Sequence, residues 1–280
     1  MTLLIPVTAA AVFALLERLT RLRFRPSPLL RRYFGSDVIY LLTGYVAGSS
    51  LAILYIVVTS RWIEEALGLP RLAALDVPMW ITVPVALVAL DLGNYVSHLL
   101  LHRVDALWEL HKVHHSSRTL DWLATFRSHF FEQTLRRLVA PLVIIAAGFP
   151  VDAVIAASGI LLVFAMSNHS NLRIDLRWVE PIFVTPRLHR LHHMPATTDR
   201  NLGTVFTIWD RLRQSLVVRE ADALCVFGVP GAVTTYPQGW GRQFIAPLRR
   251  VLTYPVTPTS SGSSSAHVVT GAEQVMLRQT

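Results

Sequence analysis

Hydrophobic and polar positions divide the chain into long apolar runs that are separated by short charged segments. Three runs, residues 3–16, 36–60 and 78–101, have the composition of membrane-spanning helices. A fourth run, residues 138–167, is apolar throughout but is interrupted by Gly148-Phe149-Pro150. This interruption predicts a helical hairpin that enters and leaves on the same side. The pattern therefore predicts an all-α fold, a multi-pass integral membrane helical protein.

The domain organisation follows from the same pattern. We expect residues 1–255 to form one membrane-embedded domain, since no linker divides them. Residues 256–280 are rich in Ser, Thr and Gly, which predicts a disordered tail that includes the isolated His267. The first apolar run follows Met1 without a basic segment or a small-residue cleavage site, so we expect a retained anchor rather than a signal peptide.

Composition and charge support a membrane location and set an orientation. Hydrophobic residues make up 52% of the chain and charged residues 16%, too apolar for an ordinary soluble domain. The net charge of +8 is explained by orientation better than by nucleic-acid binding, because residues 20–35 carry five Arg and no acid, whereas residues 61–77 carry two Arg against three acids. By the positive-inside rule the first of these loops is cytoplasmic. We therefore expect a bacterial inner-membrane protein whose third span ends on the cytoplasmic side.

Histidine supplies the candidate chemistry. Six of the eleven histidines form two copies of one pattern, His-x-x-His-His, at His111/His114/His115 and at His189/His192/His193. On a helix the positions i, i+3 and i+4 share one face, so each triplet directs three imidazoles into the same space. His98 and His102 add an i, i+4 pair, and His169 emerges from the predicted hairpin on the same side.

This array predicts a metal site built from imidazole. Neutral imidazole binds zinc, copper and iron, and the single cysteine, Cys225, excludes a thiolate site and an internal disulfide. Eight or more imidazoles exceed the needs of one ion, which favours two metals. His129 is a further candidate, either as a ligand or as a hydrogen-bond partner of one. Asp91 lies within an apolar run, where it could fix a histidine tautomer or pair with a neighbouring helix.

Other features narrow the function less. Trp108, Trp122, Trp178 and Trp209 flank the histidine region and are expected to be anchors at the membrane interface. No Gly-rich phosphate loop is recognisable in the sequence, so flavin or nicotinamide binding by this chain is not expected.

The spacing of these residues resembles the fatty acid hydroxylase/sterol desaturase superfamily of membrane di-iron enzymes, over about residues 91–216. The motifs that carry this resemblance are Asp91-x-x-x-Tyr95-x-x-His98-x-x-x-His102, Leu107-Trp-x-x-His111-x-x-His114-His115-Ser116, Arg127-Ser-His129, Asn168-His-Ser-Asn171, Thr185-Pro-Arg-Leu-His189-Arg-Leu-His192-His193, Asn201-Leu-Gly203 and Trp209-Asp-Arg-Leu212. Two departures concern the substrate pocket and leave the ligands intact. Leu202 stands where the family usually has Tyr, and Arg213-Gln-Ser215 replaces the usual Phe-Gly-Thr.

The resemblance implies two iron ions and O2-dependent oxidation of an unactivated C–H bond in a lipid drawn from the bilayer. It implies that the catalytic iron ligands are His98, His102, His111, His114, His115, His189, His192 and His193, with His169 and His129 as further metal ligands. Zinc could replace iron in purified protein. Electrons would come from an external donor, a reductase with a ferredoxin or a cytochrome b5-like carrier.

Competing functions remain open on the sequence alone. The main alternative is a non-catalytic membrane protein that binds or transports metal, although transporters place their ligands near the centre of the bilayer. A hydrolase with a metal-bound hydroxide would need only three ligands, fewer than this chain offers. Hydroxylation and desaturation are not distinguished, because both begin with abstraction of a hydrogen.

Overall fold

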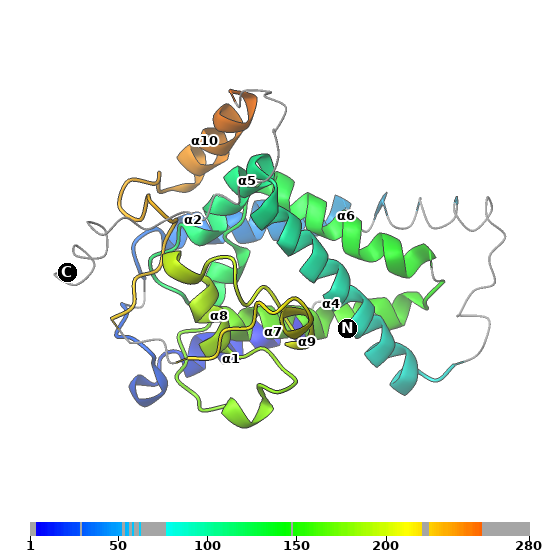
Figure 1. The fold of residues 1–280 in the computed structure, drawn as a ribbon. Coiled ribbons are helices and arrows are strands. Elements are labelled where there is room, and N and C mark those ends of the chain that lie inside the picture. Colours follow the sequence, from blue (N-terminus) through cyan, green and yellow to red (C-terminus); the bar gives the residue numbers. More distant parts are fainter. Residues whose placement is uncertain are drawn as a thin grey trace.

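The computed structural model describes residues 4–28, 30–51, 54–55, 58, 62, 77–146, 148–219 and 224–253. This part of the chain is helical and contains no strands, only two isolated bridges (Figure 1). The elements in chain order are α1 (Leu4–Leu16), η1 (Thr20–Leu22), α2 (Phe34–Tyr40), the π-helix η2 (Leu41–Ala47), α4 (Met79–Arg103), α5 (Asp105–His115), η4 (Trp122–Phe126), α6 (Phe130–Ala146), α7 (Val151–His169), η5 (Arg177–Val179), α8 (Pro186–His192), η6 (Pro195–Thr197), α9 (Ile208–Leu212) and α10 (Trp240–Leu252). The predicted helical fold is confirmed for these residues.

The predicted apolar runs coincide with helices. The first forms α1 and the third forms α4, while the second begins with α2 and η2 and ends outside the described residues. Two helices, α4 and α7, are long and apolar enough to cross a membrane. The predicted tail, residues 256–280, and His267 also lie outside the described residues.

The predicted hairpin is made by α6 and α7. Gly148 adopts a φ of 67° in the connection, a conformation that glycine reaches at no steric cost, and Pro150 caps the start of α7. The hairpin begins earlier than predicted, because α6 starts at Phe130 rather than at residue 138. The boundary at 138 marks a change from amphipathic to apolar sequence within one helix, and such a change does not break the helix.

Helix α4 is the centre of the apolar half of the molecule, where it packs against both α6 and α7. Ala86 and Leu90 of α4 meet Ile144 of α6 and Ala157 of α7 in a buried cluster. Helices α4 and α7 both end at the same side of the molecule, beside α5 and α8, and α6 runs away from that side (Figure 1). The histidines at the two helix ends are thereby brought together.

Helix α1 is fixed to the same end of the molecule by the residue that follows it. Glu17 Oε1 accepts hydrogen bonds from the backbone N–H groups of Trp122 and Asn171, each at 2.9 Å. Asn171 is the second residue after the end of α7, so one carboxyl group joins three segments that are distant in sequence. Residues 4–16 and the two long helices α4 and α7 therefore all run toward the histidine end.

Candidate metal centre

Four helices bring the histidines together. His98 and His102 lie in the last turns of α4, and His169 is the last residue of α7. The first triplet lies on α5, and the second lies on α8 and its C-cap residue, His193. Helix α8 is only seven residues long, and its start is fixed by Pro186 and by the Thr185 hydroxyl, which accepts from the Leu188 N–H.

Nine histidines form two adjacent groups of candidate metal ligands. In each group the donor atoms lie within 4.8 Å of one another. One group contains five residues and the other four, namely His98, His102, His111, His115 and His192, and His114, His169, His189 and His193. Each triplet is therefore divided between the groups, whereas the helical spacing alone predicted that its three imidazoles share one space. The division places two candidate ion sites side by side.

Hydrogen bonds at the outer face of the groups set the tautomer of four rings. A backbone carbonyl can only accept, so a neutral imidazole whose Nδ1 meets one carries its proton there and leaves Nε2 unprotonated. These Nδ1 contacts are His98 to Leu202 O (2.9 Å), His114 to Arg127 O (3.0 Å), His169 to Ala165 O (2.8 Å) and His192 to Arg200 O (3.0 Å). Orientation of an imidazole through its outer nitrogen is typical of metal sites.

The inner nitrogens are spaced as ligands of one ion would be. His114 Nε2 and His169 Nε2 are 3.0 Å apart, although both rings carry their proton on Nδ1 and neither can donate to the other. His169, His189 and His193 have Nε2 separations of 3.1–3.2 Å. Metal–nitrogen bonds of about 2.1 Å place neighbouring ligands about 3.0–3.4 Å apart. A shared cation removes the repulsion between lone pairs that these distances otherwise impose.

Burial keeps the rings in the form that binds metal. The six imidazoles of α5 and α8 are at most 4% exposed, and burial lowers the pKa of each well below its ordinary value. Among the described residues neither ring nitrogen of His115 has a hydrogen-bond partner. A buried polar atom without a partner is costly, and an ion at this position would satisfy it. The residues present therefore fit metal binding.

His129 is not brought to either group. Its Nε2 donates to Phe244 O on α10 at 3.0 Å, and its ring stacks between Phe131 and Phe244. The structure thus places this residue, directly before α6, where it contacts α10.

Asp91 acts on the site through a loop. Its carboxylate accepts three N–H groups, from the backbone of Val205 and Phe206 and from Trp209 Nε1, at 2.8–3.0 Å. The same loop presents Leu202 O to His98. Asp91 contacts no histidine directly, so it holds the chain segment that fixes one.

Leu202 keeps the contact although it departs from the family pattern. It is fully buried, and the contact to His98 is made by its backbone carbonyl, which any residue could supply. Gly203 is required, because a Cβ there would lie 2.7 Å from Phe206 O. The departure at 202 therefore leaves the orientation of His98 unchanged.

Glu132 contributes to the site although no sequence pattern indicated it. It is fully buried, and its Oε1 accepts from His111 Nδ1 at 2.8 Å while Arg136 lies 3.7 Å away. It is the only acidic residue between Asp121 and Asp152, and this isolation was the available signal.

The tryptophans differ from the expected membrane anchors. Trp108 is buried, and its ring centroid lies 5.0 Å from that of His102 and 5.3 Å from that of His115. Trp209 is bound to Asp91. Trp108 therefore packs against the site, whereas Trp209 contacts Tyr95 and Asp91, and of the four only Trp178 is exposed.

A buried ion network supports the Arg127 carbonyl that orients His114. Arg127 Nε donates to Asp37 at 2.6 Å, and Arg31 bridges Asp37 and Asp121, each at 2.5 Å. The two guanidinium groups and the two carboxylates carry equal and opposite charge, so no buried charge is left uncompensated in this network. The network connects α2 to the segments on either side of η4.

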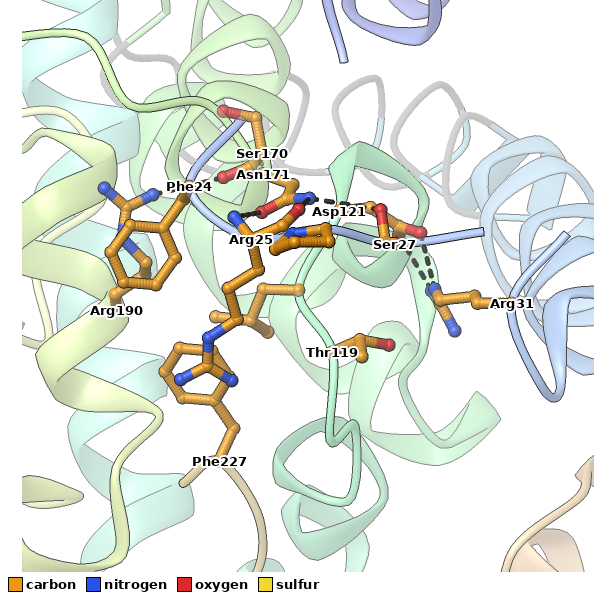
Figure 2. A pocket seen from close by; sticks show the side chains of 12 residues that line it. Phe24, Arg25, Ser27, Arg31, Thr119, Asp121, Ser170, Asn171, Arg190 and Phe227 are labelled. Carbon is orange, nitrogen blue, oxygen red and sulfur yellow. Dashed lines mark hydrogen bonds and ion pairs between the residues drawn. The ribbon is translucent and has the colours of Figure 1, made fainter. Parts of the chain in front are cut away.

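The loop before α2 closes the outer side of the four-histidine group. In a small cleft lined by Arg25, Arg31 and Arg190, the side chain of Asn171 accepts from Arg25 N and donates to Arg25 O (Figure 2). Arg190, between two α8 histidines, stacks on Phe24. The contacts fix the segments that carry His169 and His189.

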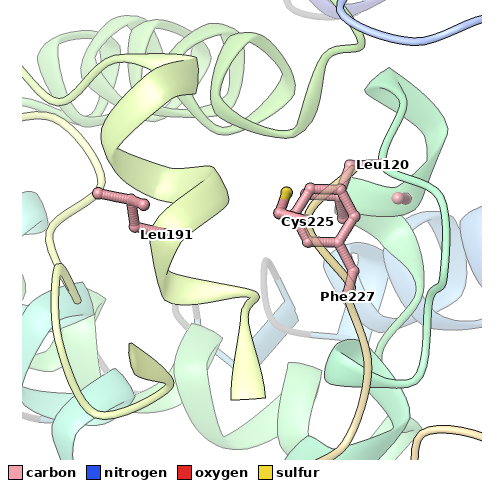
Figure 3. Packing of buried hydrophobic residues seen from close by; sticks show 5 residues of the cluster. Leu120, Leu191, Cys225 and Phe227 are labelled. Atoms are coloured by element: carbon pink, nitrogen blue, oxygen red, sulfur yellow. The ribbon is translucent and has the colours of Figure 1, made fainter. Parts of the chain in front are cut away.

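The other side of α8 rests on an apolar cluster. Leu191 faces Cys225 and Phe227, with Leu120 on the far side (Figure 3). All are at most 8% exposed. Because Leu191 lies between the histidines of the second triplet, this packing fixes the direction of α8.

Comparison with known proteins agrees with the geometry. Residues 83–215 match the family model described as fatty acid hydroxylase. The matched segment is just under half of the chain, and this segment is similar to that family. All nine grouped histidines lie within the matched residues. The family binds metal, typically iron, and the resemblance inferred from the motifs is confirmed.

Curated relatives of this chain are named as a hydroxylase and as monooxygenases. An ornithine lipid hydroxylase, OlsE, of Rhizobium tropici is 28% identical over 62% of this chain and 52% of its own length. Alkylglycerol monooxygenases of Danio rerio and Caenorhabditis elegans are each 28% identical, over 57% and 68% of this chain and 35% and 36% of their own. The chain thus spans about half or less of the relatives it matches. No solved structure matches it significantly.

Proposed function

We propose that this protein is a membrane di-iron oxygenase that oxidises an unactivated C–H position of a lipid with O2 and external electrons. The observation that carries the proposal is the pair of buried imidazole groups, in which His114 Nε2 and His169 Nε2 lie 3.0 Å apart although neither nitrogen carries a proton. Nine ligands divided five and four support two ions, and the family supports iron. Bound iron would supply activation of O2, and the protein would place the lipid carbon beside it and exclude water.

Hydroxylation is favoured over desaturation. The relatives are named as a hydroxylase and as monooxygenases, which insert oxygen into their substrates. Both names also contain a lipid with a polar head, ornithine lipid or alkylglycerol. We infer that this chain hydroxylates a lipid of that general kind, drawn sideways from the bilayer.

The position of the ligands argues against a transporter. The nine imidazoles lie at the ends of α4 and α7 and on α5 and α8, and transporters hold their ions midway along broken helices. Six of the rings are additionally enclosed on helices that are too short to span a membrane.

The membrane placement is part of the proposal. Helices α4 and α7 would span, α6 would complete the hairpin, and the histidine end would face the cytoplasm because residues 20–35 are basic. Electrons would come from a separate reductase and its ferredoxin or cytochrome b5-like carrier.

The test is incorporation of labelled oxygen from ¹⁸O2 into membrane lipid, with the reductase and carrier present. Wild type should label lipid, and His114→Ala and His192→Ala, one from each group, should not, with membrane insertion retained since neither residue lies in a span. His267→Ala, outside the matched region, should label like wild type. Undiminished labelling by the two site variants would exclude the proposed centre.

A further inference from the structure

The segment that follows α7 exposes apolar side chains although it belongs to none of the helices that could span a membrane. Trp178 is 80% exposed, Ile182 58% and Leu212 72%, and Ile174 and Ile208 are exposed as well. Thr207 N donates to Ile182 O at 2.9 Å, so residue 182 and the start of α9 are adjacent. The exposed residues Ile174, Trp178, Ile182, Ile208 and Leu212 are called the α9 patch below.

Two contacts place the α9 patch beside the spans. The ring of Phe183 stacks on Phe164 of α7 and on Phe206, each with centroids 5.6 Å apart. Phe164 precedes the end of α7 by five residues, or about 7–8 Å along the helix axis.

The second contact lies deeper. Asp91, which holds Val205, Phe206 and Trp209, is at the midpoint of α4, about 18 Å from either end of that helix. The polypeptide after α7 therefore stays in contact with α4 and α7. It folds back along them: Trp209 of α9 contacts α4 through Asp91, and Phe183 contacts α7 through Phe164 (Figure 1).

The surroundings of the patch indicate what covers it. The neighbouring outer face of α4 is apolar, with Val88 and Leu92 exposed. Next to patch residues in the sequence are the exposed Arg173, Arg177 and Arg211, of which Arg177 pairs with the exposed Asp175. An exposed Trp with apolar neighbours and a basic border is the composition of protein surface at the boundary between acyl chains and phosphate headgroups.

We propose that the α9 patch is inserted into the interfacial region of the leaflet on the histidine side, in contact with phospholipid. The patch lies on acyl chains at the headgroup boundary, and its basic border meets lipid phosphates. This inference rests on the membrane placement proposed above, and its test must separate the two.

The test is the accessibility of nitroxide spin labels in anionic phospholipid nanodiscs. Single cysteines at 178, 182 and 212 are made in a Cys225→Ser background, with Val85→Cys on the exposed face of α4 as the lipid control and Arg118→Cys at the histidine end as the water control. Power saturation compares relaxation by O2, which concentrates in lipid, with relaxation by a water-soluble nickel chelate. Equal metal content in each variant shows that the fold is kept.

The three patch labels should show an O2-to-nickel ratio several-fold above that of residue 118 and a depth between residues 85 and 118. Nickel accessibility equal to that of residue 118, with residue 85 still in lipid, would overturn the patch assignment alone. A nickel-accessible residue 85 would overturn the membrane placement and the patch with it. Spin–spin broadening at 178 or 212 would assign the patch to a second copy of the chain and contradict lipid contact.

Discussion

The orientation of several histidines in this site depends on the hydrogen-bond partner of the outer ring nitrogen. The triplets could be recognised as candidate ligands from spacing alone, because i, i+3 and i+4 share a helical face. Their division into two groups could not, since it depends on acceptors far away in sequence, such as Arg127 O for His114 and Glu132 for His111. For the same reason His129 could not be separated from the other candidates, since only the fold shows that it faces Phe244.

Glu132 should strengthen metal binding by the five-histidine group. Glu132→Ala leaves His111 Nδ1 without its buried partner and should weaken that ion's binding by about 10–100-fold, and Glu132→Gln, which keeps an acceptor oxygen, should weaken it less. Chelator competition on purified protein measures both. Asp199→Asn is the matched control, because Asp199 lies 3.3 Å from His102 but is 62% exposed, so that water can replace it. Wild-type affinity in Glu132→Ala would contradict this role.

His129→Ala should lower the stability of the protein without lowering its metal content. It removes the bond to Phe244 O and two ring contacts, so we expect a loss of stability of about 1–3 kcal/mol and unchanged metal content. Thermal unfolding and elemental analysis of the same preparation provide both readouts, and His114→Ala serves as the comparison that loses metal. Loss of an ion in His129→Ala would return this residue to the ligand set.

At the scale of elements, the sequence predicts a helix or turn best where the pattern within that segment alone is sufficient. Helices α4 and α7 follow from their apolar length, and the turn between α6 and α7 from Gly148-Phe149-Pro150. The start of α6 at Phe130 was not predicted, because the sequence changes from amphipathic to apolar inside that helix. The inward packing of Trp108 was not predicted either, because it depends on the neighbouring helices. Junctions between elements are likewise set by single groups such as the half-buried Glu17.

Glu17 should make the attachment of α1 depend on pH. Desolvation raises the pKa of this carboxyl to about 7, against an ordinary value of 4.5. The folded state therefore binds the proton more tightly than the unfolded state. Its contribution to stability is full below about pH 4.5 and is lost as the pH rises through about 7.

Glu17→Gln keeps the acceptor for Trp122 N and Asn171 N and removes the charge. Relative to wild type, the variant should gain stability between pH 5 and pH 8 by an amount on the order of 1–3 kcal/mol. Melting curves of both proteins across that interval in one detergent measure the difference. A difference that is constant with pH would show that Glu17 has an ordinary pKa.

At the scale of the whole molecule, α1, α4 and α7 run toward the histidines and α6 runs away from them. Both proposed spanning helices thus end at the same side of the molecule, which agrees with the relation that the hydrophobic pattern predicted. The compartment itself depends on the charge of the loops and remains a prediction.

Labelling from one side of the membrane tests that orientation. We expect a cysteine at Glu64 to react from the periplasmic side and one at Arg118 to react from the cytoplasmic side, because the arginines of residues 20–35 hold their loop in the cytoplasm. Intact cells treated with a membrane-impermeant maleimide should label position 64 alone. Labelling of both positions from outside would refute the topology.

The central claim is that nine imidazoles hold two ions, and the iron content of the purified chain tests it most directly. Wild type grown with sufficient iron should contain about two equivalents per chain. His189→Ala combined with His193→Ala, which removes half of the four-histidine group, should retain about one. A wild-type content of one ion or none in folded protein, or the loss of both ions in the double variant, would contradict two separate sites.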